Sequence, residues 1–257
     1  MCRLLGIYGA ADVWQEITMQ FRYLAQTGKI PPEKNLEPGH KAGWGMAVSN
    51  RKKTAMLPLV RQLGCALDAS CYPEALSSTD GIPHIFLCHL RKASTGIPVT
   101  LSNTHPFFHN GWAFTHNGTI YGAEALPRSP QLILTGDDSD SEYLFHYLLS
   151  QIDRDRHTPR DVHEILAEAV CGLTLGYTAV NSMLSNGREL YVIRSFKQYE
   201  DYYNLYWYRL ATTVIICSEP LEFPHLDPTQ WKPMAADSIL KISGSPPVVE
   251  EFPLPSR

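Results

Sequence analysis

Cys2 directly follows the initiator methionine, which places two reactive groups on one residue if Met1 is removed. We expect the mature chain to begin at Cys2, with a thiol and a free α-amine. The ordinary pKa values of these groups are about 8.5 and about 7.7–8.0, so the amine can take the thiol proton near neutral pH. Cys2 would then supply both a nucleophile and its base, as covalent amide hydrolysis requires. Taken alone, a cysteine at this position is also compatible with chance.

Acyl transfer further requires groups that stabilise an oxyanion and hold the substrate, and two segments offer them. Asn117 and Gly118 follow an apolar stretch. We expect them in a turn, where a side-chain amide and a backbone N–H could point at one oxygen. Arg91 ends a strand-like stretch, where its guanidinium could bind a carboxylate through two parallel hydrogen bonds. An ordinary Asn-Gly turn and a solvated loop arginine remain the alternatives.

Acidic and hydroxyl side chains are concentrated at 138–142, directly before apolar residues at helical spacing. Such residues stabilise the start of a helix, so capping is expected to account for at least one of them. A second carboxylate in this segment could instead hold an ammonium group. The segment therefore combines a helix start with a candidate substrate contact.

Composition gives no support for a nucleic-acid or membrane partner. The chain is 44% hydrophobic and 19% charged with a formal net charge of -4, which provides a core but no basic surface for nucleic acid or membrane. No apolar run approaches the roughly 20 residues that span a bilayer, and the first residues do not resemble a secretory signal. The six cysteines are scattered, and Cys88 and Cys217 lie in apolar stretches. We expect reduced thiols in a cytoplasmic protein, without metal or other cofactor.

Hydrophobic periodicity predicts helices and strands in separate blocks. Helices are expected at 12–28, from Glu142 to Ile152, and at 160–170, and Asn186-Gly187 indicates a hairpin turn. Blocks without regular βα alternation favour an α+β fold with antiparallel sheets. Because no clean linker is present, we expect a single domain over 1–257. The expected strands are 2–10, 45–49, 55–60, 84–90, 112–115, 177–184, 189–194, 205–210, 213–217 and 239–242.

A series of short motifs runs through the chain in a fixed order. They are Met1-Cys2-Arg3-Leu4-Leu5-Gly6, Gly39-His40-Lys41-Ala42-Gly43-Trp44-Gly45, Arg91, Asn103-Thr104-His105-Pro106-Phe107, His116-Asn117-Gly118, Ser139-Asp140-Ser141-Glu142 and Cys217-Ser218-Glu219-Pro220-Leu221, followed by Trp231. With these motifs the chain resembles the class II glutamine amidotransferases, most closely the small single-domain branch that includes the bacterial YafJ-like proteins. The resemblance covers nearly the whole chain, and several motifs in order are more specific than any one alone.

The resemblance implies a fold and a set of roles. The fold would be the four-layer αββα sandwich of N-terminal-nucleophile hydrolases. Cys2 would be the nucleophile, and Asn117 with Gly118 would form the oxyanion hole. Arg91 would bind the α-carboxylate of the glutamyl group, and Asp140 its α-ammonium. Attack on the γ-carbonyl would give a glutamyl thioester and ammonia, and water would then release glutamate.

Two positions depart from the family pattern. Related proteins commonly carry Asp where this chain has Ala42, and biosynthetic members place Trp where it has Lys92. The changed residues leave specificity for free glutamine open. The resemblance implies structural roles for His40, His105 and His116, and no metal site.

Four functions remain open on this basis. The protein could hydrolyse glutamine and pass ammonia to a separate synthase subunit, or hydrolyse a γ-glutamyl peptide or thiol conjugate. It could also be a non-catalytic regulatory subunit that keeps the fold. A cysteine-nucleophile amidase of another type, such as a bile-salt or penicillin V amidase, fits the motifs less well.

Overall fold

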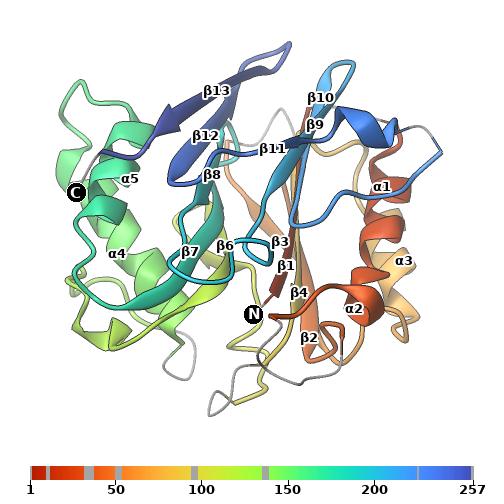
Figure 1. The fold of residues 1–257 in the computed structure, drawn as a ribbon, viewed down its shortest axis with the longest axis horizontal. Helices are drawn as coiled ribbons and strands as arrows, with labels where there is room; N and C mark the ends of the chain where they lie inside the picture. The colour runs from red at the N-terminus through yellow and green to blue at the C-terminus, as the bar shows by residue number, and fades with distance from the viewer. Residues whose placement is uncertain are drawn as a thin grey trace.

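Two β-sheets face each other in the middle of the molecule, and helices cover the outer face of each (Figure 1). The structure, a computed structural model, describes residues 2–9, 12–31, 38–49, 54–93, 98–134, 139–224 and 226–255. The helices are α1 (Trp14–Phe21), α2 (Leu24–Thr27), α3 (Cys71–Ser77), α4 (Asp140–Asp155) and α5 (Val162–Cys171), with short 3-10 turns at Ala123–Ala125 and Pro228–Gln230.

The first sheet has seven strands, and each neighbouring pair runs antiparallel. Their order is β11-β9-β10-β1-β4-β2-β3. The first strand of the chain is therefore central and buried on both faces, as its nearly continuous apolar sequence requires. The strands are β1 (Cys2–Gly9), β2 (Gly43–Ser49), β3 (Leu57–Leu63), β4 (Ile85–Arg91), β9 (Tyr206–Leu210), β10 (Thr213–Cys217) and β11 (Lys232–Pro233).

The second sheet has six strands in the order β13-β12-β8-β7-β6-β5, and its pairs are also antiparallel. Its long central strands are buried along both faces. The Asn186-Gly187 turn joins two neighbouring strands, as predicted. The strands are β5 (Phe107–His109), β6 (Trp112–Ile120), β7 (Tyr177–Ser185), β8 (Leu190–Arg194), β12 (Ser238–Ser243) and β13 (Val248–Pro253).

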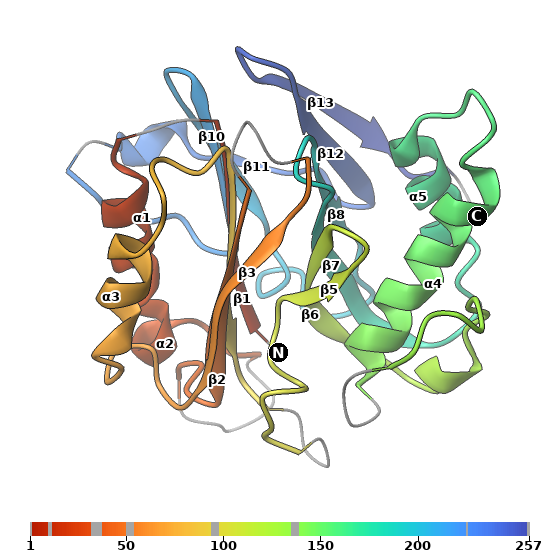
Figure 2. The ribbon, with the colours of Figure 1, turned by 180° about the vertical axis from the view of Figure 1, so that it is seen from behind.

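Side chains alternate along each strand, so every central strand contributes to two layers of core. In β1, Leu4 and Tyr8 pack between the sheets, whereas Leu5 and Ile7 pack against the first group of helices. A third core lies between the second sheet and α4 with α5. Figure 2 shows the same layers from behind, with the start of β1 at one end of the sandwich. The sandwich thus brings the chain terminus next to strands of both sheets.

The structure corrects several predicted boundaries. The helix expected at 12–28 is broken at residues 22–23 into α1 and α2, and the strand expected at 112–115 continues to Ile120. Sequence periodicity missed α3, whose single Pro interrupts a short apolar pattern, and the edge strands β5, β11 and β13. Short elements carry too few residues for a period to be recognised.

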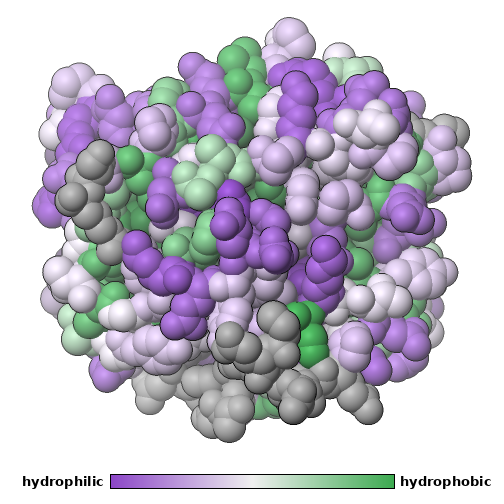
Figure 3. Space-filling model, in the orientation of Figure 1, coloured by the Kyte–Doolittle hydropathy of each residue, from purple (hydrophilic) through white to green (hydrophobic). Residues whose placement is uncertain are grey.

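Among the described residues, no helix combines the length and the apolar character needed to cross a bilayer. On the face seen in Figure 3, hydrophilic and hydrophobic side chains are interspersed.

Candidate functional site

Strand pairing places two of the predicted site residues directly opposite each other. Cys2 in β1 pairs with Arg91 in β4, which in turn pairs with Gly43 in β2. Directly opposed residues of antiparallel strands point to the same face, so the thiol and the guanidinium share the space between the sheets. Both side chains are buried, at 6% and 4% exposure. Arg91 also donates to the carbonyls of Pro98 (2.8 Å) and Thr100 (3.3 Å), which hold its guanidinium in place.

Asn117 connects the second sheet to the start of the first. The backbone nitrogen of Cys2 donates to Oδ1 of Asn117 at 2.7 Å, across 115 positions of sequence. Since Oδ1 accepts this bond, the orientation of the amide is fixed and its NH₂ group points away from the Cys2 nitrogen. A single side chain therefore locates the nitrogen of the residue that carries the thiol.

Gly118 lies inside β6 and not in the turn that the sequence suggested, because the strand continues past it to Ile120. The pairing with β7 shifts between Gly118 and Ile120, which marks a bulge. A Cβ at Gly118 would lie 1.8 Å from the carbonyl oxygen of Ala179, and real Cβ atoms do not approach so closely. The position accepts glycine alone because two backbones meet there.

Asp140 is the first residue of α4, and its carboxylate accepts the backbone N–H of Ile120 at 2.8 Å. The residue before it, Ser139, makes no side-chain capping bond, but Asp140 and Glu142 lie in the first turn of the helix, where acidic side chains stabilise the helix start as expected. A second link is made by His116, whose Nε2 faces the carbonyl of Ala179 (3.2 Å) and whose Nδ1 accepts from Ser141 (2.9 Å). Burial lowers the pKa of His116 to about 4, although Asp140 acts in the opposite direction, so the ring is neutral.

The predicted residues converge on one polar cavity. Its volume is about 30 Å³. Asn117 reaches the site through its bond to Cys2. Residues that line it include Cys2, Arg91, Asn103, His105, Gly118 and Asp140. Among the described residues, no cluster of His, Cys, Asp and Glu is arranged to hold a metal ion.

The charges around Cys2 favour its thiolate. Burial alone would raise the pKa of the Cys2 thiol, but the charges of the amino terminus and His89 lower it to about 6. The other two fully buried thiols behave differently, since burial raises the pKa of both Cys88 and Cys217 to about 12. Burial also lowers the pKa of Arg91, and the Cys2 charge opposes that shift. The difference between the thiols thus comes from the charges around Cys2.

This difference predicts selective alkylation. Iodoacetamide reacts with thiolates, so the rate of Cys2 modification should rise as pH increases through about 6 and fall below it. Cys88 and Cys217 should stay unmodified in the folded protein at neutral pH. Intact mass and peptide mapping across pH 5–9 would measure this. A midpoint near 8.5 for Cys2 would contradict the prediction.

Sequence reasoning missed the contacts that anchor β1. Arg3 is fully buried, and its Nε binds Oε1 of Glu219 at 2.5 Å while Nη1 donates to the Cys2 carbonyl at 3.1 Å. Its guanidinium also lies over the ring of Tyr202, 4.4 Å from the ring centre. Beside it, Ser218 accepts the N–H of Leu4 at 2.9 Å. The motif at 217–221 was visible in the sequence, but its pairing with residues 3 and 4 was not.

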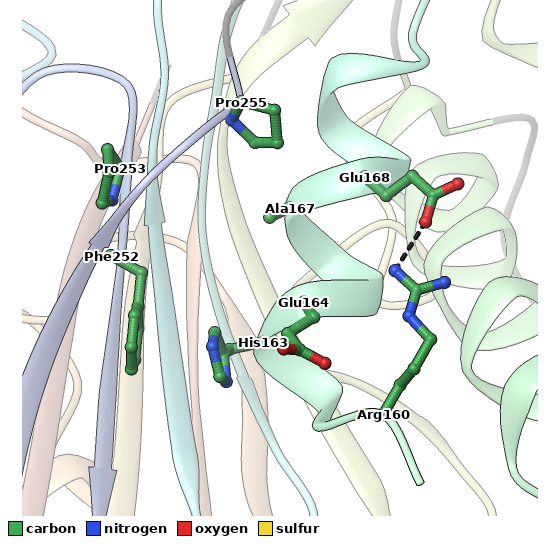
Figure 4. Close-up of a pocket in the computed structure, with 8 residues that line it drawn as sticks. All are labelled: Arg160, His163, Glu164, Ala167, Glu168, Phe252, Pro253 and Pro255. Atoms are coloured by element: carbon green, nitrogen blue, oxygen red, sulfur yellow. Dashed lines mark hydrogen bonds and ion pairs between the residues drawn. The ribbon is translucent and has the colours of Figure 1, made fainter. Parts of the chain in front are cut away.

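A larger hollow, of about 540 Å³, lies between α5 and β13 (Figure 4). None of the predicted site residues lines it. The ring of His163 stacks on Phe252 at 3.8 Å, and Arg160 pairs with Glu168 at 2.6 Å. Its described charged groups are engaged with one another or with α5, which makes the smaller cavity at Cys2 the better candidate for chemistry. Its lining consists of Arg160, His163, Glu164, Ala167, Glu168, Phe252, Pro253 and Pro255.

Comparison with known proteins agrees with the geometry. The family model for class II glutamine amidotransferases matches residues 1–236, and the chain belongs to that family. An uncharacterized protein of Methanocaldococcus jannaschii is 29% identical over 202 residues, covering 77% of this chain and 52% of that protein. The chain therefore spans about half the length of this curated relative.

Solved structures share the fold. A glutamine aminotransferase class-II domain protein from Silicibacter pomeroyi matches with a TM-score of 0.66 and 19% identity, over 99% of this chain and all of that one. A glutamine phosphoribosylpyrophosphate amidotransferase from B. subtilis matches with a TM-score of 0.63 and 16% identity, over 100% of this chain and 50% of that one. The predicted αββα sandwich of N-terminal-nucleophile hydrolases is thereby confirmed.

Proposed function

We propose that the protein hydrolyses the side-chain amide of glutamine, or of a γ-glutamyl compound, with Cys2 as the nucleophile. The observation that carries the proposal is the 2.7 Å bond from the Cys2 nitrogen to Asn117, in the cavity where Arg91 lies directly opposite Cys2. A nucleophile, an amide donor, a cation and a carboxylate are thus close together at one end of the sandwich. Acyl transfer needs this combination of groups.

The first step is attack of the Cys2 thiolate on the γ-carbonyl carbon. A bond forms between sulfur and carbon, and the carbonyl oxygen becomes an oxyanion. The Asn117 amide and the Gly118 N–H donate to this oxyanion, and such donors contribute about 2.7–4 kcal/mol each in comparable sites. The α-amine of Cys2, free once Met1 is removed, takes the thiol proton and returns it to the leaving nitrogen.

The glutamyl group is held through its two α-substituents. Arg91 binds the α-carboxylate, and Asp140 binds the α-ammonium with the carboxylate oxygen that does not accept from Ile120. Loss of ammonia or an amine leaves a γ-glutamyl thioester on Cys2. Water then cleaves the carbon–sulfur bond, releases glutamate and restores the thiol.

Two forms of this reaction differ in what is useful to the cell. If ammonia is the product, we propose that a separate synthase subunit accepts it. If glutamate removal is the purpose, the substrate is a γ-glutamyl peptide or thiol conjugate. Lys92, at the position of the biosynthetic Trp, favours the second form because it changes the residue next to Arg91.

The test is release of glutamate from glutamine and from γ-glutamyl dipeptides, with release of aspartate from asparagine as the shorter control. We expect turnover of at least one glutamyl substrate and none of asparagine, because Arg91 and Asp140 fix the distance to the amide. The ratio of kcat/KM for glutamine to kcat/KM for the γ-glutamyl dipeptides shows which of the two forms of the reaction the protein carries out. A protein whose Cys2 is alkylated readily but which releases no glutamate from any of them is a non-catalytic member of the family.

A further inference from the structure

Two buried histidines lie beside Cys2 and have no part in the proposed mechanism. His89 and His105 are 0% and 4% exposed, and their ring centres lie 4.2 Å apart with the planes inclined by 50°. None of their four ring nitrogens bonds to an oxygen or nitrogen atom among the described residues, and the Cys2 thiol is the polar group next to His89. A buried polar atom without a partner destabilises the fold by about 1–3 kcal/mol, so both rings require an explanation.

The register of the first sheet directs His89 toward the thiol. Cys2 pairs with Arg91, and Leu4 pairs with His89. Cys2, Arg91 and His89 therefore share one face of the sheet, and His89 is the diagonal neighbour of Cys2. Diagonal pairs are about 7–8 Å apart at Cα, within reach of an imidazole and a thiol.

Two glycines make room for the second ring. On the other side of β4, Gly43 pairs with Arg91 and Gly45 pairs with His89, so β2 presents no side chains there. A Cβ at Gly45 would lie 2.3 Å from the His105 carbonyl oxygen, and one at Gly43 would lie 3.2 Å from Oγ1 of Thr104. The segment that carries His105 lies flat on these glycines, and its ring packs on His89.

We propose that His89 donates an N–H hydrogen bond to the Cys2 thiolate, and that His105 is a positioning residue that holds the His89 ring by stacking. This rests on the proposed function in that it concerns the same nucleophile. No proton transfer is needed, because an imidazole carries an N–H donor whether it is neutral or protonated. Such a bond stabilises the thiolate over the thiol and fixes the direction of the sulfur.

The ring that stacks on His89 carries no charge. Burial lowers the pKa of His105 well below 6.5, and the charge of His89 acts in the same direction. The His105 ring is therefore neutral and acts on His89 through packing. The other titratable groups that act on these rings and on Cys2 are the amino terminus, Arg91, His116 and, through His116, Asp140. The guanidinium of Arg91 is held by the carbonyls of Pro98 and Thr100, which leaves His89 as the donor on the same strand face that is not bonded to a carbonyl.

The experiment measures alkylation of Cys2 by iodoacetamide against pH in the full chain. His89→Phe removes the donor and keeps a ring, so the midpoint should rise by at least one pH unit, which is about a tenfold loss of rate below the midpoint. The limiting rate at high pH should stay unchanged. His89→Gln keeps an N–H and should give an intermediate midpoint.

Further variants separate the packing role of His105 from any effect of its charge. His105→Phe keeps the stack and should keep the wild-type midpoint, whereas His105→Ala and Gly45→Ala should raise it. His146→Gln is the matched control, because His146 is also buried with an unbonded Nδ1 but lies in α4. Its midpoint should equal that of the wild type.

An unchanged midpoint in folded His89→Phe would overturn the proposal. If that variant does not fold, as circular dichroism would show, an unchanged midpoint in His89→Gln and His105→Ala overturns it equally. Alkylation requires no amide substrate, so the outcome is independent of catalysis. A raised midpoint in a protein that hydrolyses no glutamyl amide supports the role of His89 and contradicts the proposed function.

Discussion

Cys2→Ala is expected to lower kcat for glutamyl amide hydrolysis by at least about 1,000-fold, which is a modest estimate for loss of a covalent nucleophile. Among the described residues that line the cavity, Cys2 is the one thiol. The nearby hydroxyl of Ser141 bonds to Nδ1 of His116 and is not placed to replace it. Release of glutamate under saturating substrate would measure the loss.

The control for this experiment is Cys171→Ala. Cys171 is a half-buried thiol at the end of α5, and its Sγ bonds to the Pro255 carbonyl at 3.3 Å. The Cys171→Ala variant should keep full glutamyl amide hydrolysis activity. Cys2→Ala removes one sulfur atom from a small cavity, so its thermal midpoint should stay close to that of the wild type. A folded Cys2→Ala protein with wild-type activity would end the proposal that Cys2 is the nucleophile.

Arg3→Met should destabilise the fold by about 3–5 kcal/mol, the range for breaking a buried ion pair from one side. The Glu219 carboxylate, 15% exposed, would keep its bond to the N–H of Lys29 (2.8 Å) but lose its cation. The carbonyls of Cys2 and Lys29 would also lose their donor. Denaturation followed by tryptophan fluorescence would measure the change.

A matched exposed pair provides the comparison. Arg154 binds Asp155 at 3.1 Å with 60% of its side chain exposed, so Arg154→Met should cost no more than about 1 kcal/mol. The Arg3 variant should also lose activity beyond its loss of folded protein, because its guanidinium holds the Cys2 carbonyl. A change in stability equal to that of Arg154→Met would show that the buried pair contributes little.

The sequence sufficed for the fold class because the strands are long and apolar. It also identified Cys2, Arg91 and Asp140, since each stands at an end of an element with a recognisable pattern. The roles of these residues stay predictions, but the structure brings them to one cavity. Gly118 was assigned to a turn because Asn-Gly pairs are typical of turns, whereas the bulge in β6 depends on its neighbour β7.

The contacts of other residues could not be predicted from local sequence patterns. Arg3 and Glu219 are separated by 216 positions, and nothing near either residue indicates the other. The apolar neighbours of His89 in the sequence predict only a strand. Its role could not be predicted, because its contacts come from β1 and from the segment at 103–105. Contacts of this kind are decided by strand order, and strand order is a property of the whole chain.

The position of β1 between β4 and β10 has a consequence for synthesis. The residues of β1 pair with Thr213–Cys217, which are synthesised after β4 and most of the other strands. Until then the terminal strand has one hydrogen-bonded neighbour at most, and such distant pairings form late. A nascent chain would therefore carry an ordinary, weakly reactive sulfhydryl, and would acquire its reactive one only when translation of the domain is nearly finished.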